Sequence, residues 1–295
     1  MFTFLIVRYS IYNPANDLKV TRRAVRSYRT KDLLFSRERM RMRARLFEHV
    51  TLNSLKHQSP ALDPARVRML LFTSDQLPND ERAHLDRMVA DHPWIQVLPV
   101  ADVSHMQPAT TAAIRSTLSE HFPGQARVPY ATLRLDDDDA VSYDFLARVR
   151  KHVAPAFVGM CLSMGRGYSG WVDEDGQFVG FRELIFPNIA IGLSYIGAYS
   201  VSDDRFLARY ETIFSLGRHT TVHLKAPTIL NCRRPAYVRT LYAGQDSSSV
   251  NKQLYKDGAE VTPDVVMKRV PLDPRMLARF APTASQAKET DLAAD

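Results

Sequence analysis

Short apolar segments alternate with longer helical segments through the first half of the 295-residue chain. Segments long enough to form strands are each followed by a segment whose apolar residues recur at helical spacing. This order predicts an α/β fold with a mostly parallel, doubly wound sheet. Ligands of such sheets bind outside the carboxyl ends of the strands. The expected strands cover residues 2–7, 67–72, 94–100 and 128–135, and the expected helices cover residues 31–56, 80–90 and 109–120.

Four consecutive aspartates follow directly on the last of these strands. Side chains alternate in direction along a strand, so Asp136 and Asp138 are expected on one side and Asp137 on the other. A helix capped by Asp139 or Ser142 is expected to follow. Adjacent like charges repel one another unless a cation or water relieves them, and carboxylate oxygens suit Mg²⁺ or Mn²⁺. We interpret the cluster as a divalent metal site, the alternative being a solvated helix N-terminus.

Length and composition fit a single domain over residues 1–281, followed by a flexible tail over residues 282–295. The two cysteines exclude a disulfide framework and favour a reducing compartment, so a cytoplasmic location is expected. The longest uncharged stretch, residues 184–202, is interrupted by proline and glycines. Buried strands are expected there in preference to a transmembrane helix.

Positive charge is concentrated in one segment. Between Lys19 and Lys56 the chain has twelve Lys or Arg residues and three acidic residues, although the formal net charge of the whole chain is only +7. The segment is interpreted either as a solvated helix face or as a contact for an anionic partner, such as a lipid-linked acceptor, a membrane surface or a phosphate. Nucleic acid is not an expected partner, because no recognition motif accompanies the charge. Five arginines alternate within the segment: Arg37, Arg39, Arg41, Arg43 and Arg45.

The second half of the chain predicts a smaller antiparallel flank. Residues 173–176 form an acidic turn between two apolar pieces, which favours a hairpin, and a helix is expected over residues 204–216. Residues 165–170 match G-x-G-x-x-G but precede a strand and a turn, so they are interpreted as a flexible loop near the site. His219 and His223 are expected on one face of a strand, either as structural residues or with one of them completing the metal coordination.

Three segments resemble a bacterial family of rhamnosyltransferases of the GT-A type: Arg8 to Ser10 after the first strand, residues 132–145 around the aspartates, and residues 217–249. The resemblance implies a GT-A-like, mostly parallel sheet with an antiparallel flank on the acceptor side. It also implies a nucleotide-sugar donor, with deoxythymidine diphosphate-rhamnose as the expected one. Tyr242 to Asp246 depart from the family pattern, since a late histidine ligand is absent at position 242.

The resemblance assigns roles to particular residues. Asp136 is expected near the ribose and Asp138 on a Mn²⁺ or Mg²⁺ ion that bridges the diphosphate. The expected nucleotide-sugar-binding residues are Arg8, Ser10, Asp75, Arg134, Asp136 and Asp137, and the expected metal ligands are Asp138, Asp139 and His219.

The predicted function is metal-dependent transfer of a sugar to a glycan or lipid-linked acceptor, with peripheral membrane contact through residues 19–56. An inverting transfer needs a carboxylate that accepts the acceptor's proton, for which Glu183, Asp173 and Asp203 are the candidates. The alternatives are an aspartate-dependent phosphohydrolase and a non-catalytic module that binds cations or lipids. The hydrolase is disfavoured, because its nucleophile would be expected on an early strand, and the first strand here ends in Arg8.

Overall fold

A computed structural model describes residues 1–13, 30–243, 255, 257–277 and 280. The expected tail over residues 282–295 lies outside the described residues, as do the basic residues between Lys19 and Arg29 and the motif positions 244–246.

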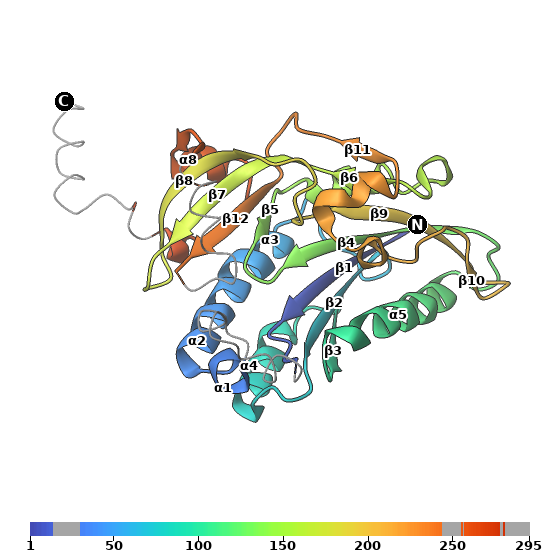
Figure 1. The fold of residues 1–295 in the computed structure, drawn as a ribbon, viewed down its shortest axis with the longest axis horizontal. Coiled ribbons are helices and arrows are strands. Elements are labelled where there is room, and N and C mark those ends of the chain that lie inside the picture. Colours follow the sequence, from blue (N-terminus) through green and yellow to red (C-terminus); the bar gives the residue numbers. More distant parts are fainter. Residues whose placement is uncertain (14–29, 244–254, 256, 278–279, 281–295) are drawn as a thin grey trace.

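The larger sheet has eight strands in the order β11-β6-β9-β4-β1-β2-β3, with β10 paired to β9 (Figure 1). Four neighbouring strands, β1, β2, β3 and β4, run parallel. Each begins and ends within two residues of the bounds expected from the sequence. On the other side of β4, strand β9 pairs with it in the antiparallel direction. The bounds are β1 Phe2–Tyr9, β2 Val67–Ser74, β3 Ile95–Val100, β4 Val128–Asp136, β6 Cys161–Ser163, β9 Ser194–Ser200, β10 Arg205–Phe206 and β11 Thr228–Leu230.

Helices cover both faces of this sheet (Figure 1). On one face, side chains of β1 such as Leu5 and Val7 pack with Phe47, Leu55 and Leu85 from the covering helices. On the other face, the alternate side chains of β1 pack against α5. The alternating apolar residues of the strand thus supply two cores at once. The helices on the first face are α1 Lys31–Leu34, α2 Arg37–Leu46, the π-helix η2 Phe47–Leu52, α3 Asn53–Lys56 and α4 Asn79–Val89; α5 spans Met106–His121.

A second sheet of five strands, in the order β13-β8-β7-β12-β5, stands beside the end of β4 (Figure 1). Its strands pair antiparallel except for β7 with β12, and the hairpin expected around residues 173–176 joins β7 to β8. The mostly parallel larger sheet and the smaller, mostly antiparallel second sheet confirm the predicted α/β architecture. The bounds are β5 Ala140–Val141, β7 Arg166–Val172, β8 Phe178–Ile185, β12 Tyr237–Tyr242 and β13 Glu260–Val261.

The expectation of a flexible loop at residues 165–170 is wrong, because most of this stretch belongs to β7. Its glycines are needed for close packing. A Cβ atom at Gly167 would lie 2.5 Å from the Tyr237 ring, and one at Gly170 would lie 2.6 Å from the Phe178 ring. The absence of a side chain therefore lets aromatic residues lie directly on the strand.

Three other local predictions are wrong. The expected helix over residues 204–216 is instead β10, a loop and the short 3₁₀ helix η5 Ile213–Leu216, and the expected strand at 219–224 is the 3₁₀ helix η6 His219–Leu224. Neither Asp139 nor Ser142 caps a helix, since α6 Phe145–Arg150 begins after Asp144. The remaining elements are η3 Val103–His105, η4 Pro155–Phe157, α8 Pro263–Met267 and η7 Pro274–Met276.

The uncharged stretch 184–202 contributes the fully buried strand β9, as predicted. No helix within the described ranges is both long enough and apolar enough to cross a bilayer.

Candidate active site

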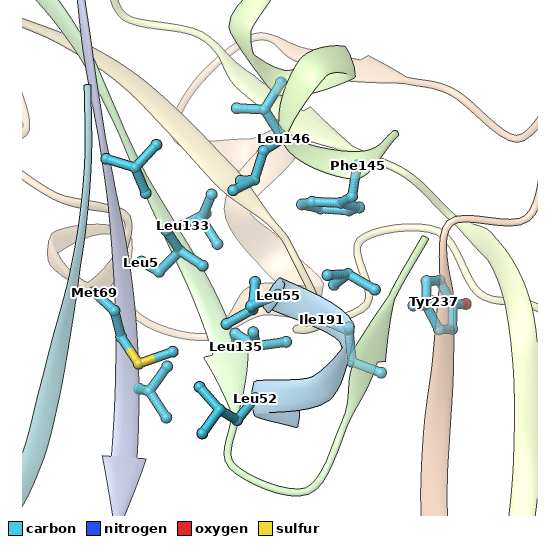
Figure 2. Packing of buried hydrophobic residues seen from close by; sticks show 14 of the residues in the cluster. Leu5, Leu52, Leu55, Met69, Leu133, Leu135, Phe145, Leu146, Ile191 and Tyr237 are labelled. Carbon is cyan, nitrogen blue, oxygen red and sulfur yellow. The ribbon is translucent and has the colours of Figure 1, made fainter. Parts of the chain in front are cut away.

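The end of β4 is held by a packed apolar core (Figure 2). Leu133 and Leu135 of β4 lie in the same buried cluster as Leu52, Leu55 and Phe145, which come from the π-helix, α3 and α6. All five side chains are at most 2% exposed. Because a close-packed core allows little displacement, the residues that follow Leu135 leave the sheet at a defined point.

Asp136 is paired with an arginine of the neighbouring strand. The parallel register places Arg8 of β1 beside Asp136 of β4, and Arg8 Nη2 lies 3.4 Å from Asp136 Oδ1. Both side chains are about two-fifths exposed, at 42% and 40%. The pair is therefore open to solvent or to a ligand, and a partly exposed ion pair of this kind adds little to stability.

Asp137 comes directly after the end of β4, in the turn that leads to β5, so the alternation expected of a strand does not extend to it. It does not line the cleft formed by its neighbours, and its side chain is 1% exposed. Arg43 of α2 provides the opposite charge, with Nε 2.8 Å from Oδ2. Burial raises the pKa of Asp137 to about 7, although Arg43 opposes this shift. We infer that Asp137 anchors α2 to the aspartate cluster.

Asp138 and Asp139 are buried residues that line the cleft together with Asp136. Asp139 Oδ1 accepts a hydrogen bond of 2.8 Å from the backbone N–H of Thr240 in β12. Burial, followed by the nearby charges of Asp138 and Asp136, raises the pKa of Asp139 well above its ordinary value. Carboxylates held so close together are a natural site for a cation.

We call this cleft the main cleft; its volume is about 1460 Å³. The arginine row of α2 forms one wall, and the turn between β7 and β8, which contains Asp173, forms another. Acidic residues therefore face a strongly cationic helix across a cavity large enough for an extended ligand. Lining residues include Arg8, Asp136, Asp138, Asp139, Asp173, Arg239, Tyr242 and the row itself, Arg37, Arg39, Arg41, Arg43 and Arg45.

Hydrogen bonds made by Arg39 and Arg43 help to hold the arginine row in place. Arg39 Nη1 donates to Ser10 Oγ at 3.1 Å and to the backbone carbonyl of Leu34 at 2.8 Å. Arg43 Nη1 donates to the Tyr242 hydroxyl at 3.4 Å. Ser10, a predicted nucleotide-binding residue, thus contacts a residue of the main cleft, and Tyr242 contacts the arginine that pairs with Asp137.

A second, smaller cavity adjoins the main cleft, and we call it the side pocket. Its volume is about 530 Å³, and Arg8 lines both cavities. Arg134, predicted to bind the nucleotide sugar, and His219, predicted to bind the metal, both line the side pocket and not the main cleft. The lining residues are Arg8, Arg134, Phe214, Gly217, Arg218, His219 and Thr220.

The two histidines converge on Asn188. His219 Nδ1 lies 2.7 Å from the Asn188 carbonyl oxygen, and His223 Nδ1 lies 3.0 Å from the Asn188 side-chain nitrogen. Burial lowers the pKa of His219. His219 is therefore positioned by the backbone of a neighbouring loop, and the structure does not bring it to the main cleft beside Asp138 and Asp139.

Of the three candidate proton acceptors, the structure brings only Asp173 to the main cleft. Asp173 Oδ1 accepts from the backbone N–H groups of Asp175 at 3.0 Å and Gln177 at 2.9 Å. Glu183 is bound to Arg166 of β7, at 2.6 Å from its Nε, and lines neither cavity. Asp203 follows β9, whose last residues pair with the start of β4, so it lies at the opposite end of β4 from the aspartates.

Asp75 is exposed directly after β2 and lines neither cavity. The sequence analysis did not single out Arg43, Arg239 or Thr240 as residues of the site, although all three line the main cleft. The alternation of arginines in α2 was a signal for the first. No pattern in the sequence marks the other two, which reach the site through the pairing of β12 with β5 and β7.

A divalent ion can be tested against this geometry. Among the residues that the structure describes, no group of three or more His, Cys, Asp or Glu side chains is arranged to hold a metal by itself. Mg²⁺ commonly uses one or two carboxylates together with substrate phosphates and water. Asp138 and Asp139, with the arginine row opposite, fit an ion of this shared kind better than a closed protein site.

Comparison with known proteins gives one family. No curated protein matches the chain. Among solved structures, a crystal structure of residues 1–349 of TarS from S. aureus matches with 12% sequence identity and a TM-score of 0.37, covering 81% of this chain and 60% of that chain. The present chain thus spans less than two thirds of the TarS structure. A family model described as "Putative rhamnosyl transferase" matches residues 3–253, and the chain belongs to that family.

Proposed function

We propose that the protein is a glycosyltransferase that moves a sugar, rhamnose in our prediction, from a nucleotide diphosphate donor to a glycan or lipid-linked acceptor. The observation that carries the proposal is that Asp136, Asp138 and Asp139 line one cleft with a row of arginines. Membership of the rhamnosyl transferase family supports the same reaction class. Deoxythymidine diphosphate-rhamnose is the proposed donor.

The charges of the main cleft suit the two parts of such a donor. A diphosphate carries negative charge that grows as the glycosidic bond breaks, and fixed cations stabilise it most in that state. The arginine row supplies these cations, and Arg8 pairs with Asp136 at the carboxyl end of β4. The cleft volume of about 1460 Å³ exceeds the usual size of a small-molecule site, so it leaves room for part of the acceptor.

Asp138 and Asp139 would hold the Mn²⁺ or Mg²⁺ ion that we propose. When bound, the ion would add positive charge next to the leaving diphosphate. The residues of the chain would orient the donor so that its anomeric carbon faces the acceptor hydroxyl. For an inverting transfer, Asp173 is the proposed proton acceptor, because it alone of the three candidates lines the cleft.

The arginine row also bears on the proposed membrane contact. All five of its arginines line the main cleft, which favours a phosphate-bearing ligand over a solvated face for this part of the basic segment. Peripheral membrane contact through residues 19–56 and a cytoplasmic location stay predictions.

Titration calorimetry tests the proposal. Deoxythymidine diphosphate-rhamnose should bind in the presence of Mn²⁺ and much more weakly with EDTA. Asp138→Ala should remove the metal-dependent part of the affinity, whereas Asp91→Ala, an exposed aspartate outside both cavities, should not. Equal affinity with and without metal in the wild type, or release of phosphate from a monoester, would contradict the proposal. The latter result would favour the phosphohydrolase, and metal or lipid binding alone would favour the binding module.

A further inference from the structure

The side pocket lies where a second substrate could meet the donor. Arg8 lines both cavities and is paired with Asp136, which lines the main cleft. Arg134 precedes Asp136 by two residues on β4, so both side chains project from the same face of the strand. The side pocket therefore includes a residue of β4 only two positions from Asp136, and Arg8 lines both the pocket and the main cleft.

The charged side chains that line the side pocket are all cationic. Three of the seven lining residues are arginines, and no carboxylate lines the pocket. The guanidinium carbon of Arg134 lies 4.7 Å from the centre of the Phe214 ring. In the part of the chain that the structure describes, no ion pair joins Arg134 or the exposed Arg218 to a carboxylate. Burial lowers the pKa of Arg134, and the nearby charge of Asp136 opposes this shift.

The uncharged lining groups suit a sugar. Because the Asn188 carbonyl accepts from His219 Nδ1, the other ring nitrogen of the neutral imidazole carries a lone pair that can accept from a hydroxyl. Thr220 adds a hydroxyl group, and Phe214 adds an apolar ring. Planar guanidinium groups bind carboxylates and phosphates through paired hydrogen bonds, which gives the pocket its selectivity for an anion.

We propose that the side pocket binds the anionic group, a carboxylate or a phosphate, of an acidic sugar in the acceptor, with Arg134 and Arg218 as its ligands. The inference rests on the proposed function, since it takes the main cleft to be the donor site. It goes further by assigning the acceptor to a chemical class.

The test uses simple sugars as probes. Glucuronate carries a carboxylate, glucose 6-phosphate carries a phosphate, and glucose is the neutral match. Titrations followed by ligand-observed NMR should show at least one acid binding about tenfold more tightly than glucose, as a charge-assisted hydrogen-bond pair predicts. The acid that binds identifies the source of the negative charge. The proposal would be overturned if glucose bound as tightly as both acids, or if neither acid bound at millimolar concentration.

Variants locate the binding. Arg218→Ala changes an exposed side chain and should weaken the acid about tenfold. Arg134→Lys keeps the charge but loses the planar fork, so it should also weaken the acid. Arg127→Ala removes an exposed arginine just before the opposite end of β4 and should have no effect. Acid affinity that is unchanged in Arg218→Ala and Arg134→Lys would place the binding elsewhere and reject the inference.

Competition separates this inference from the proposed function. Binding of the acid should persist when the main cleft is saturated with Mn²⁺ and deoxythymidine diphosphate. Displacement of the acid by the nucleotide would mean that it binds the main cleft, and the side-pocket inference would fail. If the nucleotide itself does not bind while the acid still depends on Arg218, the donor assignment fails and the anion pocket stands.

Discussion

Arg43 and Asp137 form an ion pair between α2 and the aspartate cluster, in which the aspartate is buried and the arginine side chain is 19% exposed. Arg43 Nε lies 2.8 Å from Asp137 Oδ2, and the Asp137 side chain is 1% exposed. The two residues are far apart in the sequence, so their contact ties the cationic wall of the main cleft to its acidic wall. Within the described residues, neither Asp137 oxygen has a geometrically aligned hydrogen bond, so the charge of Arg43 is the main compensation there for the buried carboxylate.

Arg43→Met should therefore destabilise the protein. Removing one partner of a buried ion pair costs about 3 kcal/mol or more, because the other charge stays buried. Urea denaturation followed by circular dichroism measures the change in the free energy of unfolding. Arg43→Met/Asp137→Asn should recover part of the loss, since it removes the unpaired charge. A single variant as stable as the wild type would show that the pair contributes nothing to the fold.

Arg41→Glu should weaken donor binding without affecting stability. Arg41 is exposed and lines the main cleft, so reversing its charge changes the field at the proposed diphosphate site and leaves the core intact. We expect about tenfold weaker binding of deoxythymidine diphosphate-rhamnose at low salt, and a smaller difference at high ionic strength. Arg127→Glu, outside both cavities, is the matched control. Equal losses in the two variants would indicate a general charge effect and not a local contact.

The parallel sheet was predictable because its cues are local. The strand expected over residues 128–135 is β4 Val128–Asp136, and the helix expected over residues 109–120 is α5 Met106–His121. These predictions needed only the spacing of neighbouring residues.

The parts that could not be predicted depend on contacts distant in the sequence. Gly167 and Gly170 suggested a loop when only their sequence neighbours were considered. The Tyr237 ring that requires Gly167 comes about seventy residues later, and local pattern rules do not cover contacts at that separation. The contact of His219 Nδ1 with the Asn188 carbonyl oxygen joins residues 31 positions apart, so the sequence could not predict it. Thr220, Thr221, Val222 and Leu224 favoured a strand, chiefly through their β-branched side chains, but tertiary context overrides such a propensity and the segment is a 3₁₀ helix.

Gly167→Ala tests the packing explanation for β7. The added methyl group would lie 2.5 Å from the Tyr237 ring, which is fully buried and cannot move freely. Overpacking of this kind costs about 1–3 kcal/mol. Thermal denaturation should show a lower Tm, and Gly167→Ala/Tyr237→Leu should restore part of it by making room. A rise in Tm for the single variant, as expected from reduced backbone freedom in the unfolded chain, would contradict the close contact.

Asp273→Ala tests a pH-dependent contact near the arginine row. Asp273 Oδ1 accepts from the backbone N–H of Arg275 at the start of η7, and Oδ2 lies 2.7 Å from Arg275 Nη2 and 3.1 Å from His49 Nδ1. Although burial opposes the shift, hydrogen bonds from Arg275 and its charge hold the pKa of Asp273 below its ordinary value. Asp273 is the N-cap residue of η7. Its replacement should lower the free energy of unfolding by about 1 kcal/mol at neutral pH.

The lowered pKa of Asp273 sets the sign of the pH dependence of stability. A carboxylate whose pKa is lower in the folded state contributes stability above its unfolded pKa, and this contribution is lost as the pH falls through the folded pKa. The difference in unfolding free energy between the wild type and Asp273→Ala should therefore be full at pH 7 and shrink below about pH 4. Urea titrations at both pH values measure it, with the exposed Asp91→Ala as control. A difference that grows on acidification would mean that the ionised carboxylate is not the stabilising form.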